Sequence, residues 1–543
     1  MLKRTLCILL SMLIIVTCFY GCGEIKGAEE TIILPIDKDP EYLDPQIISY
    51  VGSKNIIANC FEGLVALDEE GKIVPAVAKS WEVSPDGLKY TFKLREDAKW
   101  RVSTSSGNLL GENYKETFDT TVTAYDFEFA IQRAVKPETK SPGAVYLYSI
   151  KNAKSISEGK TKLSKLGVKA KDRFTLEIIL ERADPDFLYT LLESACMPCN
   201  EEFFNATRGR YGLSVKYLIY NGPFYINNWA DDASVTLRKS DTYYGKDSVM
   251  PRSLYFSINN EQNTRLKKLQ DDVYTIAPLT LKQANEFTQK KKNQVKAFNS
   301  SCLSLVFNCE DTALKNVNIR RAIVSSMDLS VLKNALGEIT AKGIVPSSHR
   351  IGTLFYREFS RSIEPYSNPK PQELFLKGLD AIDENDIEVT VLCSKDNEAT
   401  VRSLMQSWQS TLGIAFGVFV EAVDEYELKA RVESGEYQIA LCDTVYEGNT
   451  AFSAVHRFTS YHKDNIANYA SEKYDELVSD IKLASGIDNT ESATRKAEQY
   501  LIKSAVIVPL YDNQIYYGLD KGVSGVIFSL SGDVLYLKNT LAA

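Results

Sequence analysis

The chain has 543 residues, 44% of them hydrophobic and 25% charged, with a formal net charge of −8 at pH 7. A chain of this length is longer than a domain with a single hydrophobic core usually is, so we expect two or three domains. The acidic balance leaves no basic patch, which argues against a nucleic-acid partner.

The N-terminus has the features of a secretory signal. Residues 1–21 begin with two basic side chains, continue with an apolar run over 6–16 and end at a glycine before Cys22. The apolar run is short for a transmembrane helix. Its end resembles a bacterial lipobox, which implies that Cys22 carries a diacylglyceryl group and that residues 22–30 tether an extracytoplasmic body. A plain secreted protein with an incidental cysteine is the alternative.

The clearest strand signals follow this segment. The apolar run 31–36 predicts a first strand. Along 88–94, apolar and polar residues alternate with the period of a strand that has one solvated face. Residues 81–83 predict a partner strand, and Ser84-Pro85-Asp86-Gly87 predicts a type I turn between the two. The sequence therefore predicts a β-hairpin.

Several segments are similar to one family. They are Leu43-Asp44-Pro45, Cys60-Phe61-Glu62-Gly63-Leu64-Val65, Pro75-Ala76-Val77-Ala78 with Trp81-Glu82 and the hairpin, Tyr220-Asn221-Gly222-Pro223-Phe224-Tyr225, and 316–323. By these motifs the chain is identified as a member of the extracytoplasmic solute-binding proteins of peptide ABC importers (oligopeptide/dipeptide-binding family, solute-binding protein family 5). The resemblance implies a periplasmic-binding-protein-like α/β fold with two hinged lobes and an inserted α+β lobe, a three-domain arrangement.

The resemblance also implies domain boundaries. Lobe I is expected to be discontinuous and to comprise residues 31–64, 200–297 and 510–543. Residues 65–199 are expected to form the inserted lobe II, and residues 298–509 to form lobe III. The signal peptide and the tether precede lobe I.

The pattern of lobe III indicates a ligand site independently of the family. Three apolar strands alternate with two helices, an order that predicts parallel strands with right-handed crossovers. The segments are, in turn, 387–391, 401–412, 414–420, 424–434 and 437–441. Ligands bind beyond the carboxyl ends of the strands in such sheets. We therefore expect the site at the loop that opens with Cys442-Asp443.

A peptide pocket needs a carboxylate for the ligand's α-ammonium, backbone groups for an extended ligand, and aromatic walls. In the family an aspartate takes the ammonium just after this strand, in a run similar to Trp-Cys-Ala-Asp-Tyr. Residues 441–447 read Leu-Cys-Asp-Thr-Val-Tyr-Glu, with the aspartate one place early. The resemblance implies Asp443 as the ammonium partner, with Tyr446 and Glu447 as further candidates. A solvated loop acid is the alternative.

Three more expectations rest on the resemblance. Tyr146 matches a family tyrosine that lines the cleft, with a core tyrosine as the alternative. Val51 falls where a backbone contact to the ligand is made. Cys302 and Cys442 lie near two positions that some members join by a disulfide, with free buried thiols as the alternative.

Other chemistry has little support in the sequence. Cys196-Met-Pro-Cys199 has the spacing of a redox pair or half a zinc site, but no second pair and no histidine lies near it in the sequence. The three histidines form no metal motif, and nucleophile-elbow, phosphate-loop and His-Glu-x-x-His motifs are missing. Nothing places a glycosidase-type carboxylate pair. We therefore expect a binding protein without catalytic residues, metal or cofactor.

Together these features predict a lipid-anchored, extracytoplasmic and monomeric receptor. We expect it to capture peptides between its lobes and to pass them to a membrane permease powered by cytoplasmic ATPases. Two alternatives stay open. One is a receptor for a non-peptide solute such as a nickel chelate, a sugar or an antibiotic. The other is a sensing or interaction protein whose ligand loop has drifted, as the altered 441–447 segment suggests.

Overall fold

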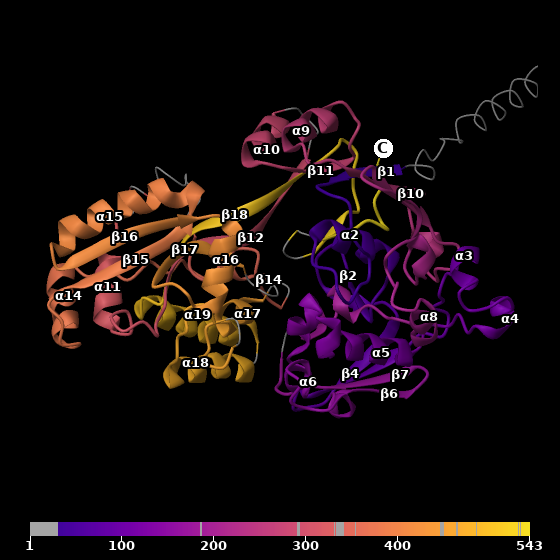
Figure 1. The fold of residues 1–543 in the computed structure, drawn as a ribbon, viewed down its shortest axis with the longest axis horizontal. Coiled ribbons are helices and arrows are strands. Elements are labelled where there is room, and N and C mark those ends of the chain that lie inside the picture. The colour runs from indigo at the N-terminus through magenta and orange to yellow at the C-terminus, as the bar shows by residue number, and fades with distance from the viewer. Residues whose placement is uncertain are drawn as a thin grey trace, which may run out of the picture.

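The computed structural model describes residues 31–184, 187–289, 294–328, 330, 332, 341–352, 354–445, 450–462, 465–484, 486–529, 532 and 534–542. Two bodies are joined in it by the long strands β12 (Gln294–Phe307) and β18 (Ile507–Leu519) (Figure 1). We call residues 31–258 with 520–542 the N-terminal body, and residues 301–510 the C-terminal body. Within the described part, no helix combines the length and apolarity that a membrane crossing requires.

The first sheet of the N-terminal body has four strands in the order β1-β10-β9-β8, of which only β1 and β10 are parallel neighbours. Its strands are β1 (Thr31–Ile36), β8 (Phe224–Ala230), β9 (Ser234–Lys239) and β10 (Ser253–Ile258). The strand predicted at 31–36 is confirmed. Its partner strand β10 lies 222 residues further along the chain, and the hydroxyl groups of Thr31 and Ser253 share a hydrogen bond.

The second sheet contains the predicted hairpin, which is confirmed. Its antiparallel order is β4-β5-β7-β6, with β4 (Ala78–Val83), β5 (Lys89–Leu94), β6 (Val168–Asp172) and β7 (Thr175–Ile179). In the turn, the Gly87 amide donates to the Ser84 carbonyl at 2.8 Å. Gly87 has a φ of +70°, which only glycine adopts without steric cost. Helix α5 (Ala124–Val135) packs on β6 and β7, and a single hydrophobic core runs through both sheets.

Helix α2 (Val51–Cys60) fastens the last residues of the chain to the N-terminal body. The side-chain oxygen of Asn55 accepts from the Leu535 amide at 2.7 Å, and that of Asn59 accepts from the Leu537 amide at 2.8 Å. The Asn59 amide group also donates to the Leu535 carbonyl at 2.8 Å. Both asparagines are buried, so these bonds satisfy polar groups that have lost their contact with water.

One six-stranded sheet, in the order β11-β18-β12-β17-β15-β16, forms the centre of the C-terminal body and continues along β12 and β18 to β11 outside it. Besides β12 and β18 it contains β11 (Ile276–Leu279), β15 (Ile387–Ser394), β16 (Phe416–Val423) and β17 (Ile439–Val445). Strand β15 is parallel to both β16 and β17, which confirms the predicted parallel β-α-β-α-β unit. Two predicted boundaries are wrong. Ile414 precedes β16 and is fully exposed. The last strand runs from Ile439 to Val445 and not from 437 to 441, so Cys442 and Asp443 lie within β17 and not in the predicted loop.

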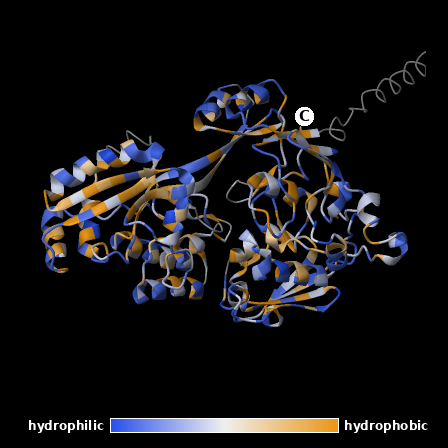
Figure 2. Ribbon diagram, viewed as in Figure 1, coloured by the Kyte–Doolittle hydropathy of each residue, from blue (hydrophilic) through white to orange (hydrophobic). Residues whose placement is uncertain are grey.

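Helices cover both faces of this sheet. One hydrophobic core contains α11 (Val317–Ser325), α14 (Pro371–Asp380) and α15 (Glu398–Leu412). The other contains α16 (Glu425–Ser434), α17 (Ala451–His456), α18 (Glu472–Leu483) and α19 (Ile487–Lys503). Figure 2 shows mostly hydrophobic strands between helices whose outer faces are hydrophilic. The parallel strands are therefore buried on both sides, as such strands usually are.

Strands β12 and β18 pair from Gln294 with Leu519 to Val306 with Ile507, with register shifts at Asn299/Ser301 and Leu303/Ser304. At one end β11 adds to β18, and at the other end β17 adds to β12 from Ser301 onward. Between these additions the two strands run without a third, and we call this part of the pair the ribbon. The expected boundaries 297/298 and 509/510 both fall inside these strands, and the domain division itself stays a prediction.

The remaining helices and strands are short. They are β2 (Val65–Leu67), β3 (Ile73–Pro75), α3 (Thr104–Gly107), α4 (Tyr114–Thr117), α6 (Ala153–Ser157), α7 (Phe187–Thr190), α8 (Glu201–Ala206), α9 (Gln262–Gln270), α10 (Leu281–Thr288), β13 (Arg350–Ile351), β14 (Leu354–Phe355), α13 (Tyr356–Phe359), β19 (Ile527–Phe528) and β20 (Leu535–Tyr536).

Candidate ligand-binding site

The carboxyl end of β17 lies where the C-terminal body meets the ribbon. Val445 pairs there with Ser301, next to the register shift of β12. Because β15 and β16 run parallel to β17, their carboxyl ends point the same way. This is the edge of the sheet at which open α/β folds bind ligands, and Asp443 is two residues from the end of β17.

Asp443 is exposed, and its carboxylate is held by polar groups of two other strands. The Asn513 amide nitrogen donates to Asp443 Oδ1 at 2.7 Å and to Ser301 Oγ at 3.2 Å. The surrounding protein partly desolvates the carboxylate and so raises the pKa of Asp443, and the carboxylate of Glu425 raises it further. An anion in this environment is stabilised by a cation, which makes Asp443 suited to the charged end of a ligand.

The one-place shift of the aspartate has a geometric consequence. Successive residues of a strand point to opposite faces, so Asp443 and Thr444 lie on different sides of the sheet. Thr444 is the residue two positions after Cys442, where the Trp-Cys-Ala-Asp-Tyr run has its aspartate. It lies opposite Cys302 on the neighbouring strand. It is completely buried, and within the described part its hydroxyl has no hydrogen-bond partner.

A second carboxylate lies on the Thr444 face, and the sequence reasoning missed it. Asp512 of β18 pairs with Cys302, which in turn pairs with Thr444. Its side chain is 5% exposed and accepts from Ser347 Oγ at 3.4 Å. Burial raises the pKa of Asp512, while the positive charge of Arg357 opposes this effect. The available signal was the polar run 512–514 inside an otherwise apolar strand. Asp443 is the more accessible of the two acids.

The structure brings Val51 and Tyr146 into one neighbourhood of the N-terminal body. Val51 is the first residue of α2 and is 42% exposed. Lys54 follows one helical turn later, and its ammonium lies 5.9 Å from the centre of the partly buried Tyr146 ring. The same ammonium is 3.8 Å from a carboxylate oxygen of Glu193. Tyr446, Glu447 and the proposed lipidation site Cys22 lie outside the described residues.

The disulfide expected between Cys302 and Cys442 is not formed, and both residues are free, buried thiols. Cys302 lies opposite Thr444, and Cys442 lies opposite Ser304, so the cysteines are diagonal neighbours. Diagonal Cα atoms on adjacent strands are about 7–8 Å apart, whereas a disulfide joins Cα atoms about 4.4–6.8 Å apart.

Cys196 and Cys199 have packing roles in the core of the N-terminal body. The Cys199 sulfur accepts from the Arg133 guanidinium at 3.3 Å, and the Cys196 thiol donates to the Thr190 carbonyl at 3.4 Å. Burial raises the pKa of Cys199 to about 12, so the thiol is protonated at neutral pH. A redox or metal role needs an accessible thiolate. Within the described residues, no group of three histidine, cysteine, aspartate or glutamate side chains is arranged to hold a metal ion.

The two bodies also meet directly, away from the ribbon. The Arg182 guanidinium lies 4.5 Å from the centre of the Tyr461 ring, and Asp184 interacts electrostatically with Lys482. Arg350 donates a hydrogen bond to the carbonyl of Glu70. These contacts join loops of the N-terminal body to α18, to the loop after α17 and to β13.

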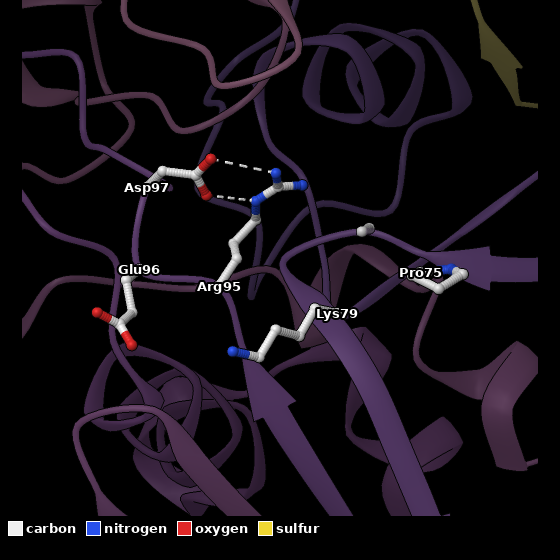
Figure 3. A pocket seen from close by; sticks show the side chains of 6 residues that line it. Pro75, Lys79, Arg95, Glu96 and Asp97 are labelled. Atoms are coloured by element: carbon white, nitrogen blue, oxygen red, sulfur yellow. Dashed lines mark hydrogen bonds and ion pairs between the residues drawn. The ribbon is translucent and has the colours of Figure 1, made fainter.

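A surface depression of about 440 Å³ lies in the N-terminal body (Figure 3) and is lined by Pro75, Ala76, Lys79, Arg95, Glu96 and Asp97. Figure 3 shows the Arg95 guanidinium held by the Asp97 carboxylate, with Lys79 and Glu96 beside them. The Arg95 guanidinium also stacks on the Tyr244 ring, with 3.1 Å between its central carbon and the centre of the ring. All six lining residues come from the β3–β5 region, so Asp443 is not part of this depression.

Comparisons with known proteins agree with this architecture. The chain is 26% identical over 518 residues to the dipeptide-binding protein DppE of Bacillus subtilis, covering 92% of this chain and 90% of that protein. It is 26% identical over 508 residues to the probable deoxycholate-binding periplasmic protein YgiS of Escherichia coli, and the match covers 92% of this chain and 91% of that protein. The solved substrate-binding domain of an oligopeptide ABC transporter from Bacillus anthracis is similar with a TM-score of 0.70 and 26% identity, over 95% of this chain and 99% of that one.

The family model for bacterial extracellular solute-binding proteins, family 5, matches residues 72–465. This span includes the sheet β4-β5-β7-β6 with the hairpin, the parallel unit and Asp443. The predicted multi-domain α/β architecture is thereby confirmed. The chain belongs to the bacterial extracellular solute-binding proteins of family 5.

Proposed function

We propose that this protein is the receptor of an ABC importer and that it captures peptides between its two bodies. The main observation behind this proposal is that nine-tenths of the chain is similar to proteins named for dipeptides and oligopeptides. The site supports this proposal through Asp443, an accessible carboxylate beside the ribbon. In the proposed complex, Asp443 receives the α-ammonium of the peptide. Val51 and Tyr146 contact the peptide from the N-terminal body, and Tyr446 and Glu447, which come shortly after Asp443 in the sequence, are further candidate contacts.

Binding and closure are coupled in this proposal. The ribbon bends, and the two bodies approach each other around the ligand. A ligand shifts this equilibrium only by its preference for the closed form. Capture therefore requires contacts from both bodies, and the peptide leaves unchanged because binding is the only chemistry that we assign to the site. Delivery is to a membrane permease driven by cytoplasmic ATPases.

The proposal includes a lipid anchor on Cys22 at the outer face of a membrane. It is supported by the lipobox-like segment that precedes Cys22. Eight residues, 23–30, separate this cysteine from β1, and an extended segment of this length spans at most about 30 Å. The protein body would then stay close to the permease. Labelling with a radioactive or clickable palmitate, compared between the natural chain and Cys22→Ala, tests the anchor.

A thermal-shift panel tests the ligand class. It contains di- to pentapeptides, sugars, nickel chelates and deoxycholate, and uses the natural chain, Asp443→Asn and Asp247→Asn. Asp247 is an exposed acid of the N-terminal body and serves as the matched control. Peptides are expected to stabilise the natural chain and Asp247→Asn, but not Asp443→Asn. A response to none of the peptides contradicts the proposal.

A non-peptide solute is the second candidate function. It is favoured by the similarity to YgiS, whose name gives deoxycholate as the probable ligand. Stabilisation by deoxycholate, with no dependence on Asp443, would favour this reading, because a bile-acid anion has no cation for the aspartate.

A further inference from the structure

The side chain of Asn513 lies at the point where the ribbon enters the C-terminal body. Asn513 is on β18 and pairs with Ser301 of β12, at the register shift that follows Asn299. Ser301 also pairs with Val445, the last residue of β17. The position therefore lies at the boundary between the ribbon and the edge of the sheet that carries Asp443.

One amide group connects three strands at this position. Asn513 Nδ2 donates to Asp443 Oδ1 of β17 at 2.7 Å and to Ser301 Oγ of β12 at 3.2 Å. The three residues are far apart in sequence: Asn513 is 70 positions from Asp443 and 212 positions from Ser301. Asparagine is disfavoured in strands, so a preference for this secondary structure does not explain its presence here. Its two hydrogen bonds to neighbouring strands do explain it.

We propose that Asn513 is a positioning residue that holds the Asp443 carboxylate for the cationic end of the ligand and ties it to the hinge. This proposal rests on the proposed function, in which Asp443 receives the ligand's ammonium. Asp443 is part of the C-terminal body, whereas Asn513 is on a strand that continues into the ribbon. Bending of the ribbon therefore changes the Asn513–Asp443 contact, and occupation of Asp443 changes the preferred bend. Such coupling is reciprocal.

The test uses tri-alanine and N-acetyl-tri-alanine, which lacks the ammonium. Calorimetry gives the affinity of each peptide for the natural chain and for Asn513→Leu, Asn513→Gln, Asp443→Asn and the double variant Asn513→Leu/Asp443→Asn. Leucine has nearly the shape of asparagine without its donors, and glutamine restores the amide. The preference for tri-alanine over its acetylated form is the readout, because a general loss of folding lowers both affinities alike.

Asn513→Leu is expected to reduce this preference about tenfold, the effect of one hydrogen bond to a charged group. Asn513→Gln is expected to restore part of the preference. In the Asp443→Asn background, Asn513→Leu is expected to add nothing, since the two residues act as one unit. Equal losses for both peptides, or full additivity of the two substitutions, would overturn the positioning role.

A second measurement needs no ligand and separates this proposal from the proposed function. Fluorescent labels on the two bodies report their distance in the ligand-free protein. Asn513→Leu and Asp443→Asn are expected to shift this distance distribution in the same way, because each removes the same tie. If neither variant shifts the distribution, the tie to the hinge is refuted. If both shift it but tri-alanine does not bind, the hinge role stands and the assignment of a peptide ligand fails.

Discussion

The guanidinium of Arg133 and the carboxylate of Asp44 form an ion pair of 2.6 Å between Nη2 and Oδ2, and both side chains are more than nine-tenths buried. Arg133 belongs to α5, which packs on the hairpin sheet, and Asp44 follows β1 of the first sheet. The same guanidinium donates to the Gln46 side chain at 2.6 Å and lies 3.9 Å from the Phe204 ring. This pair therefore connects the two halves of the N-terminal body.

We predict that Arg133→Met lowers the free energy of unfolding of the N-terminal body by about 3–5 kcal/mol, since Asp44 is left as an unpaired buried charge. Urea unfolding measures the loss. Arg402→Met is the matched control, because its pair with Glu398 is largely exposed and is expected to contribute about 0–1 kcal/mol. Equal losses in the two variants would contradict the role of burial.

We predict that His349 contributes to acid instability. Burial lowers the pKa of His349 to about 3, and the charge of Arg357 adds to this effect. A histidine of the unfolded chain takes up its proton near pH 6.5, so the unfolded state binds more protons between these values. The free energy of unfolding is therefore highest above pH 6.5 and falls below it, by up to about 1.4 kcal/mol per pH unit.

His349→Leu is expected to remove the part of the decrease in unfolding free energy at low pH that His349 causes. Urea unfolding at several pH values between 4 and 7.5 gives the comparison, and the natural chain is the reference. An unchanged acid slope in the variant would assign the instability to carboxylates instead.

We predict that peptide affinity falls in mildly acidic solution. The pKa of Asp443 is raised by desolvation and by Glu425, and a bound ammonium favours the charged form and lowers it again. Binding therefore releases protons, and affinity decreases as the pH falls through the raised pKa. Calorimetry in two buffers of different ionisation enthalpy counts these protons. Asp443→Asn is expected to release none, and a natural chain that also releases none would exclude Asp443 from the site.

We predict that Arg182→Ala shifts the two bodies apart. The substitution removes the contact with Tyr461, and an exposed contact of a cation with an aromatic ring contributes about 0.5–1 kcal/mol. A shift of this size changes the ratio of open to closed forms about two- to fivefold. Small-angle scattering or an interbody fluorescence distance measures it. Arg173→Ala is the control, since Arg173 pairs with Asp119 inside the N-terminal body, and an equal shift there would exclude a specific interbody effect.

We predict that a reducing agent leaves the melting temperature unchanged, because Cys302 and Cys442 are free thiols on diagonal positions. Calorimetric melting with and without dithiothreitol checks this, and a Cys302→Ser/Cys442→Ser variant serves as the reference. A lower melting temperature on reduction, confined to the natural chain, would mean that the bridge forms in solution.

Local patterns predicted local structure well. The alternation along 88–94 and the turn at 84–87 gave the hairpin, and the order of apolar segments from 387 to 441 gave the parallel unit. Ile414 was misassigned because an apolar residue before a strand looks the same in sequence whether it is paired or exposed. Asp443 was predicted to lie in the loop after the strand, whereas it lies inside β17, two residues before its carboxyl end. Only the register of β17 assigns its side chain to the face opposite Thr444.

Contacts across distant strands could not be predicted in this way. Asp512 reaches the neighbourhood of Thr444 only through the pairing of β18 with β12 and of β12 with β17. Asn513 meets Asp443 because the strands shift register at Asn299/Ser301. Such shifts depend on the packing of the whole sheet, and a single sequence carries no local signal for them.

The position of the last strands has a consequence for biosynthesis. Strand β18 lies inside the six-stranded sheet, and β20 provides the backbone groups that Asn55 and Asn59 bind. A ribosome synthesises β18 and β20 after the strands with which they share the two bodies, so during translation neither body can complete its interior before they emerge. The nascent polypeptide therefore stays incompletely folded until β18 and β20 have emerged from the ribosome.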